Sequence, residues 1–364
     1  MKVECRFDRK SKKRRDDMTL YSGILFFSFI FLLFVGCKKE DGAHSGFLSI
    51  HETQCVKGLL AFEVLLCHIY GFYHKGIAMY LFNRMAYISV AMFFLFSGYG
   101  LVHQAGRKED YLKSFLPRRL SKLYIPLWLS LVVSALIYAL LGVERDYSAE
   151  TIVKDILGLN AIWFFFVIVC YYIAFYFVWR ITKGKHALGI LAVLVVLQCV
   201  LCAALRMDQH YFTSSFGFVL GMLLAEHQGK NSPLLPKLLS PRRWNRYALL
   251  VPALILVICG VVYWKLHESV FAWQLLCRNL VGIMIVFIIL VFLYHHQIGN
   301  KATELLGSIS YEIFLIHPAW ILSVGTGYTA SLPSGVQVAL IIGLTILSSC
   351  ILHRIGQGIL RRML

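Results

Sequence analysis

The chain has 364 residues, of which 59% are hydrophobic and only 15% are charged. This composition excludes an ordinary soluble protein, in which roughly a quarter of the residues are charged. The formal net charge of +17 could suggest a nucleic-acid-binding protein, but the Lys and Arg residues lie between apolar runs and form no continuous basic face. Positive charge beside membrane-spanning segments is the simpler explanation, so we expect the lipid bilayer, and no nucleic acid, as a partner.

Eleven apolar runs follow one another along the chain. They lie at 19–36, 58–74, 85–103, 122–142, 161–179, 187–205, 211–226, 247–264, 276–294, 307–324 and 336–353. Runs of about 18 to 20 apolar residues can cross a hydrocarbon layer roughly 30 Å thick, and lipid allows such spans only as helices or closed barrels. The pattern therefore predicts an all-α, polytopic membrane protein with about ten core transmembrane helices and one extra N-terminal apolar segment.

Every second connection between the runs is basic, which places these connections in the cytoplasm. On this assignment the run at 58–74 begins in the cytoplasm at Lys57 and runs outward. The first run, 19–36, does not fit, because the basic stretch before it also favours the cytoplasm. We expect that it does not cross fully, that it is removed as a signal-like segment, or that it places the N-terminus outside against its charge. Residues 1–50 thus form a basic N-terminus with an extra segment, and residues 51–364 form the membrane domain.

Two ionisable residues, Glu63 and His68, stand in the middle of the run at 58–74. Such groups inside a membrane cost free energy and are functional candidates by default. Lys57 precedes His68 by eleven residues, so both project from one face of a helix, about 16 Å apart along its axis. His68 is either a general base or a buried histidine that bonds a neighbouring helix. Glu63 lies on another face, where a structural partner to a basic residue is the simpler role and a proton partner the alternative.

Small and basic residues follow at the cytoplasmic side. Ser97 and Gly98 interrupt an apolar helix, either to allow close helix packing or to let a ligand approach the backbone. Arg118, Arg119 and Lys122 cluster at the membrane surface, where the next apolar run begins. They either anchor the helix or bind phosphates, which Arg engages through paired donors.

Two later stretches add polar or aromatic candidates. Trp163 begins a run as an interfacial aromatic residue or as a pocket wall, and Tyr311, Glu312 and His317 enrich an otherwise apolar run. Each polar group alone could make a helix-to-helix hydrogen bond, but their joint occurrence favours a site. Most of the ten cysteines lie inside apolar runs, where a thiol behaves as a small hydrophobic group. We therefore expect no metal site and no disulfide framework.

Five stretches resemble, in order and spacing, the acyltransferase-3 family of integral membrane O-acyltransferases, which modify sugars and lipids of the bacterial surface. They are the Lys57 to His68 spacing, "FFLFSGYGL" from Phe93, "RRLSKLYIP" from Arg118, "WF" at Trp163, and "LGSISYEIFLIH" from Leu306 to His317. The resemblance covers about residues 52–355. Two departures stand out. Lys122 replaces a usual Arg, which keeps the charge but not the paired donors, and Phe314 replaces a frequent Tyr.

The resemblance implies a multi-pass protein of the bacterial inner or plasma membrane. It implies transfer of an acyl group, most simply acetyl, from acetyl-CoA or another acyl-CoA to a hydroxyl of a cell-surface polysaccharide or lipid-linked sugar, with no metal. His68 would be the catalytic base and Lys57 its partner. The donor would contact Arg118, Arg119, Lys122, Ser97 and Gly98. A substrate pocket is expected to include Glu63, Trp163, Tyr311 and His317.

Two alternatives remain open at the level of sequence. One is a proton-coupled transporter or ion pathway in which Glu63, His68, Glu312 and His317 relay charge. Transporters often carry internal repeats with interrupted helices, and no such repeat is visible in the sequence. The other is an enzyme of the same kind that transfers a different acyl group, such as succinyl, because one sequence does not reveal the acyl pocket.

Overall fold

The computed structural model describes residues 11–39, 46–74, 77–107, 110–159, 163–229 and 271–363, together with Leu239, Leu254, Val257, Ile258 and Val261. Within these residues the α-helices are α1 (Ser11–Phe34), α2 (Ile50–Tyr73), α3 (Ile77–Ala105), α4 (Phe115–Leu141), α5 (Ala149–Leu157), α6 (Trp163–Thr182), α7 (Ala187–Ala204), α8 (Phe216–Gly229), α11 (Phe271–His295), α12 (Lys301–Ser308), α13 (Ser310–Thr326) and α14 (Ser334–Met363). Two short 3₁₀ turns, η1 (Gln209–Tyr211) and η2 (Tyr328–Ser331), and two antiparallel strands, β1 (Lys38–Lys39) and β2 (His296–Gln297), complete the described elements.

The expected all-α membrane architecture is confirmed. In the described part, seven helices are long and apolar enough to cross a membrane, and α12 with α13, which meet at a bend of 75°, would make an eighth. The count of ten core helices is not confirmed, because α8 has only 14 residues and the predicted run at 247–264 lies outside the continuously described segments.

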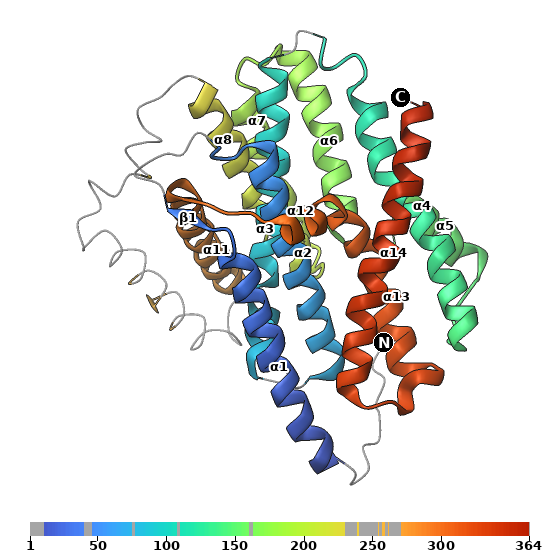
Figure 1. Cartoon of the computed structure of the whole chain (residues 1–364). Coiled ribbons are helices and arrows are strands. Elements are labelled where there is room, and N and C mark those ends of the chain that lie inside the picture. The colour runs from blue at the N-terminus through green and yellow to red at the C-terminus, as the bar shows by residue number, and fades with distance from the viewer. Residues whose placement is uncertain are drawn as a thin grey trace.

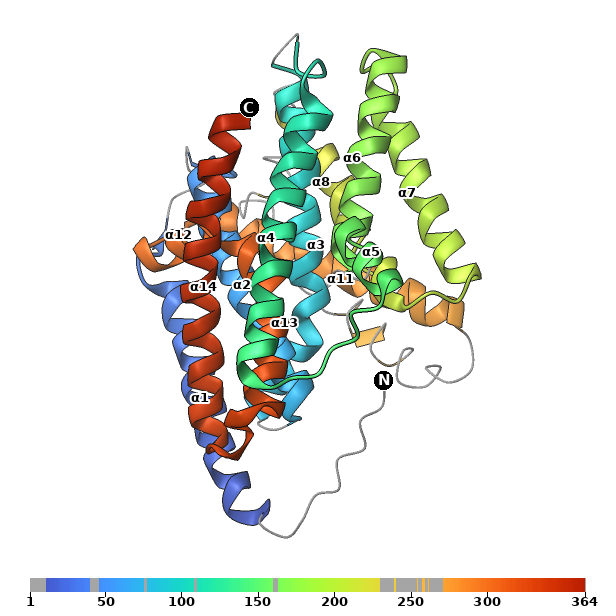
Figure 2. The ribbon, with the colours of Figure 1, turned by 90° about the vertical axis from the view of Figure 1, so that its right-hand side faces the viewer.

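The helices form one bundle with two distinct ends (Figures 1 and 2). The last turns of α3, α6 and α14 lie together at one end, near the top of Figure 1. We call it the basic end, because basic residues follow or occupy these turns, among them Arg107, Arg180 and Arg361. α2 begins toward this end and finishes toward the other, the far end, where α14 begins. This direction agrees with the one expected from the charge pattern.

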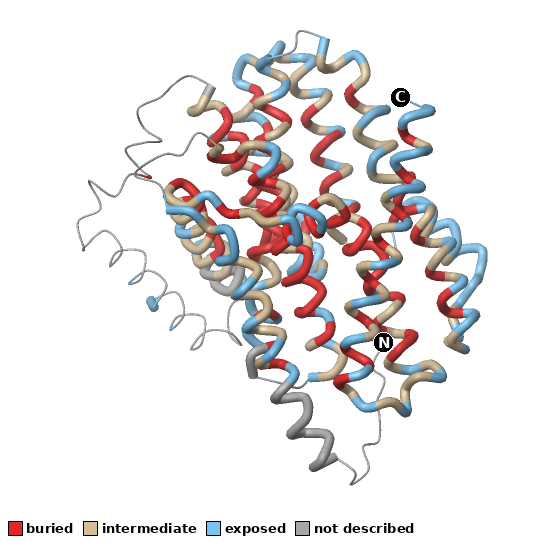
Figure 3. The backbone as a smooth tube through the Cα atoms, in the orientation of Figure 1, coloured by how far each residue is buried: buried red, intermediate tan, exposed pale blue. Residues whose placement is uncertain are grey.

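Buried residues concentrate on the inner helices, whereas the outer faces are exposed (Figure 3). α3 and α8 pack closely against each other. A Cβ atom at Gly98 would clash with the carbonyl oxygen of Phe218, and one at Gly217 with that of Ala91. Small residues thus let the two backbones approach each other. Gly98 therefore allows close helix packing, and its expected role in binding the donor remains a prediction.

α1 lies along the bundle and runs from the far end toward the basic end, antiparallel to α2 (Figure 1). Tyr21 packs against Gly335 at the start of α14. At the other end of α1, Asn300 Nδ2 donates hydrogen bonds to the carbonyl oxygens of Leu32 and Val35, at 3.0 and 2.9 Å. The first turn of α1 thus lies away from the basic end. The signal-like or non-spanning nature of residues 1–50 stays a prediction.

α5 is a short helix that turns back along α4. The carbonyl oxygens of Ile156 and Leu157 accept hydrogen bonds from Trp128 Nε1 at 2.9 Å and Tyr124 Oη at 3.3 Å, both well inside α4. An ion pair of 2.5 Å joins Arg145, in the connection between the two helices, to Asp155 of α5. As a result α6 begins partway along the bundle (Figure 2). Its first residue, Trp163, packs against the buried core.

Candidate active site

A cavity of about 990 Å³ opens among α2, α3, η1, α6, α11 and α13. Residues at the end of α2 and near the start of α3 line it, so it lies toward the far end of the bundle. Of the residues predicted from sequence, His68 and Trp163 line this cavity. Glu63, Tyr311 and His317 do not, although all three lie on helices that form its walls.

His68 projects from α2 into the cavity and meets His317 of α13. The two ring centroids are 4.7 Å apart, with an angle of 67° between the ring planes. His317 Nδ1 lies 2.8 Å from the carbonyl oxygen of Ile313, which makes Nδ1 the donor and leaves a lone pair on Nε2 of the neutral ring. His317 is only 1% exposed, and its Nε2 has no hydrogen-bond partner among the described residues. Buried polar atoms are nearly always paired, so this nitrogen marks a place where a ligand or water can bond.

Glu63 lies on another face of α2, as its spacing predicts. It is 5% exposed, and neither carboxylate oxygen has a hydrogen-bond partner within the described segments. Ser89 of α3 is the polar side chain that lies near the Glu63 carboxylate. The expected basic partner is therefore not found in the part of the chain that the structure describes.

A second cluster of charged residues lies near the basic end. Lys57 Nζ is 5.6 Å from the ring centroid of Phe96, and the charge of Arg119, from α4, acts on Lys57. Arg119 Nη2 donates a hydrogen bond of 3.0 Å to Tyr111 Oη, and its guanidinium lies 5.6 Å from the ring centroid of Tyr172. Neither cation forms an ion pair with a carboxylate in the described ranges. Two neighbouring cations without an acidic partner suit a phosphate-bearing ligand.

The other two basic residues of the predicted phosphate cluster, Arg118 and Lys122, are exposed on α4. Arg119, by contrast, is half-buried, because α4 turns it toward α2 and the aromatic rings around it. The sequence placed the three side chains in one cluster, and the structure brings one of them inward beside Lys57. The exposed pair stands at the surface, where charge attracts a ligand but holds it weakly.

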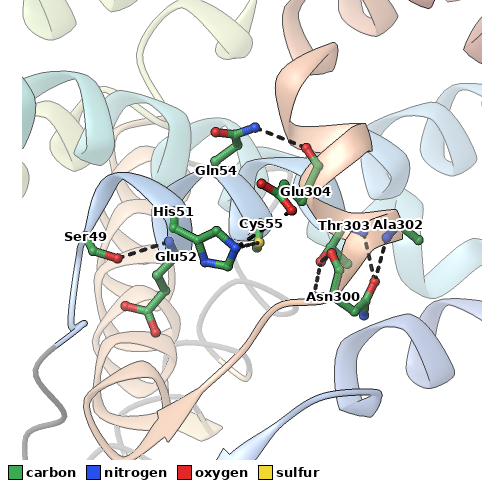
Figure 4. Close-up of polar contacts among 9 residues, drawn as sticks. All are labelled: Ser49, His51, Glu52, Gln54, Cys55, Asn300, Ala302, Thr303 and Glu304. Carbon is green, nitrogen blue, oxygen red and sulfur yellow. Dashed lines mark hydrogen bonds and ion pairs between the residues drawn. The ribbon is translucent and has the colours of Figure 1, made fainter.

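The start of α2 is fixed by contacts with α12 (Figure 4). The backbone N–H of Glu52 donates to Ser49 Oγ at 3.2 Å, which caps α2, and Asn300 Oδ1 caps α12 by accepting from two backbone N–H groups. Gln54 Nε2 donates to the carbonyl oxygen of Glu304 at 3.2 Å. A Cβ at Gly307 would clash with the backbone of Gln54. These contacts hold the first turns of α2, and with them the helix that carries Lys57 and His68.

Three other predicted residues have structural contacts instead of cavity positions. Tyr311 Oη donates to the carbonyl oxygen of Leu123 at 3.0 Å and joins α13 to α4. Ser97 Oγ donates to the carbonyl oxygen of Phe93 in its own helix, at 3.0 Å. Glu312 pairs with His353 of α14 at 2.8 Å. Binding roles for Tyr311 and Ser97 remain predictions.

Several cavity residues were not singled out from the sequence. They are Asn83 and Arg84 of α3, Gln209 and His210 of η1, and Arg278 of α11. Arg278 carried a usable signal, because an arginine inside the apolar run 276–294 is a functional candidate by the same rule that selected His68. Residues of the η1 connection carried none, since a polar residue between two spans is ordinary.

His210 forms part of the cavity wall with Trp163. The two rings are stacked, with centroids 5.8 Å apart and an angle of 19°. Burial lowers the pKa of His210, and the nearby charge of Arg278 lowers it further, while Asp208 opposes the shift. Because the pKa falls below the ordinary value of about 6.5, the ring is neutral at pH 7 and offers an uncharged aromatic face.

Most of the chain matches a known protein family. A family model described as an acyltransferase domain, of the acyltransferase-3 type, matches residues 50–354. No curated protein and no solved structure matches the chain. The matched region contains the cavity, the two facing histidines and the cation pair near the basic end.

Proposed function

The chain belongs to the acyltransferase-3 family, and we propose that it transfers an acyl group, acetyl in the simplest case, from acyl-CoA to a hydroxyl of a cell-surface polysaccharide or lipid-linked sugar. The observation that carries this proposal is the layout of α2. His68 stands in the cavity, and Lys57 stands beside Arg119 near the other end of the same helix. α2 is continuous from Ile50 to Tyr73, so the two sites lie about 16 Å apart along one helix face.

The donor would bind from the basic end, which we assign to the cytoplasm of a bacterial cell. Its phosphates would pair with Lys57 and Arg119, whose charges have no acidic partner among the described residues. Arg118 and Lys122 would attract it at the surface. The acyl thioester would extend along α2 toward His68, so the distance between the cation pair and the cavity is spanned by the donor itself.

The acceptor would enter the cavity from the far end. His68 would take the proton of the acceptor hydroxyl as its oxygen attacks the thioester carbonyl carbon. The carbon–sulfur bond then breaks, the acyl group remains on the acceptor oxygen, and the CoA sulfur leaves and takes up a proton. The unpaired Nε2 of His317 would accept a hydrogen bond from the ring of His68 and so orient that base toward the acceptor.

The proposal is tested by replacing His68 with alanine in a deletion strain and measuring the ester content of surface polysaccharide. Loss of a general base should lower the transfer rate by about 10²- to 10⁴-fold. His227→Ala, a histidine of α8 that does not line the cavity, is the matched control and should leave the ester content unchanged. Normal ester content in the His68→Ala strain, with normal protein level, would rule out the base.

The same strains separate the two alternatives. Mass spectrometry of the surface glycan reports the acyl group by its mass, which distinguishes acetyl from succinyl. A transporter would move its substrate in liposomes without any acyl donor. Its relay would also include Glu312, which pairs with His353 of α14.

A further inference from the structure

The wall of the cavity at the far end is positively charged. Its charge comes from Arg84 of α3 and Arg278 of α11, which line it beside the neutral ring of His210, and no Asp or Glu among the described residues lines it. Neither guanidinium forms an ion pair within the described segments. Asp208, which immediately precedes Gln209 in the sequence, lies 3.7 Å from His210 Nε2. Apart from Asp208 beside His210, the described part of the chain brings no carboxylate to this wall to balance the two arginines.

Both guanidinium groups are held in place by neighbouring side chains. Arg84 Nε donates a hydrogen bond of 2.7 Å to Tyr80 Oη, and the group lies 4.9 Å from the centroid of that ring. Arg278 Nη1 donates to Gln209 Oε1 at 2.5 Å, and its group lies 4.8 Å from the ring centroid of Tyr87. Each of these bonds uses one N–H donor of several. The remaining donors are already oriented, which lowers the entropy cost of binding an anion.

The two arginines border one stretch of wall close to His68. Tyr87, which lies under Arg278, is three residues after Arg84 and therefore on the same face of α3. Asn83 Nδ2 lies 3.7 Å from Cys67 Sγ, and Cys67 immediately precedes His68. One cavity thus holds the proposed base, His68, together with two amide side chains, the stacked ring of Trp163 and the two arginines. The amides are those of Asn83 and Gln209.

We propose that the acceptor is an anionic sugar, whose phosphate or carboxylate is bound by Arg84 and Arg278 while one of its hydroxyls lies beside His68. Planar, paired N–H donors match both kinds of anion. The amides of Asn83 and Gln209 then face the sugar hydroxyls, and the ring of Trp163 faces the sugar. This inference rests on the proposed function and names the class of its acceptor.

The test measures binding without turnover. The full-length protein in phosphatidylcholine nanodiscs is titrated with glucose, glucuronate, glucose 6-phosphate and inorganic phosphate, in the presence of CoA. We expect at least one charged sugar to bind about tenfold or more tightly than glucose, as charge-assisted hydrogen bonds allow. The Arg84→Gln/Arg278→Gln double variant should lose this preference. Comparison of the two charged sugars tells a carboxylate site from a phosphate site.

Arg180→Gln is the matched control, because Arg180 bonds Tyr176 four residues before it, as Arg84 bonds Tyr80, but lies in the last turn of α6 at the basic end. It should keep the preference for charged sugars. Retained CoA binding by the double variant shows that it is folded. Equal binding of charged and neutral sugars, a preference that survives in the double variant, or inorganic phosphate bound as tightly as both charged sugars would each overturn the inference.

A His68→Ala protein keeps both arginines and should keep the preference for charged sugars. Failure of the proposed chemistry would appear as unchanged ester content in that variant, whereas failure of the anion site would appear only in the titrations. The two outcomes are therefore distinguishable.

Discussion

Arg119 should contribute most of the donor affinity supplied by α4. Its guanidinium is oriented by the hydrogen bond to Tyr111 and by the rings of Phe115 and Tyr172, at 5.9 and 5.6 Å. It also faces Lys57 without an acidic partner in the described ranges. A hydrogen bond to a charged group contributes about 1.5 to 3 kcal/mol. Arg119→Ala should therefore raise the KM for acyl-CoA by about 10- to 150-fold, with kcat nearly unchanged because the lost contact serves binding alone.

Initial rates at varied acetyl-CoA concentration, measured with purified protein in liposomes, check this expectation. Arg118→Ala is the matched control, because Arg118 is the adjacent arginine on α4 but is exposed; an exposed, screened charge should change KM by less than about threefold. Tyr111→Phe removes only the hydroxyl that orients Arg119. It should give an intermediate effect, since a neutral hydrogen bond contributes about 0.5 to 1.5 kcal/mol.

The reasoning would be refuted by equal changes in KM for the Arg118→Ala and Arg119→Ala proteins, or by an unchanged KM in the latter. A map of cysteine accessibility in the Arg119→Ala protein provides a second check. Inverted spans in that map would assign Arg119 to anchoring the helix by its charge instead of to binding the donor.

Two further predictions concern packing and protonation. Gly217→Ala should destabilise the protein by about 1 to 3 kcal/mol, because its Cβ would clash with the backbone of Ala91. Gly343→Ala, whose Cβ would meet open space, should have little effect. Unfolding in mixed micelles measures the stability of both variants, and similar losses of stability would contradict the α3–α8 contact. Arg278→Gln should raise the pKa of His210, because the charge of Arg278 contributes to lowering it. Histidine-specific hydrogen exchange followed by mass spectrometry measures this pKa. A lower pKa of His210 in the variant would contradict the proximity of the two side chains.

The course of α2 could be predicted from the sequence because it depends only on local geometry. The spacing of Lys57 and His68, read with the helical period, gave their common face, and the basic connections gave the direction of the helix. The separate face of Glu63 followed in the same way. These properties belong to one helix and need no knowledge of its neighbours.

Contacts between distant helices could not be predicted in this way. The approach of His317 to His68 depends on the 75° bend between α12 and α13 and on how α13 packs against α2, and hydropathy contains no such information. The return of α5 along α4 was missed for a similar reason: a polar connection reads as a loop, and only the hydrogen bonds of Tyr124 and Trp128 show where it goes. The same return places the start of α6 partway along the bundle (Figure 2). His210 can therefore lie in the cavity, where its ring stacks on Trp163 at the start of α6.

The continuous course of α2 bears on the direction of the reaction as well as on its location. If the donor binds near one end of this helix and the acceptor in the cavity near the other, as proposed, the two products of the transfer would leave into different compartments. Reversal would need CoA and the ester to meet again at His68 from opposite faces of the membrane. The ester could then accumulate outside while CoA is recharged inside, so one uninterrupted helix would make the chemistry vectorial without carrying any whole molecule across.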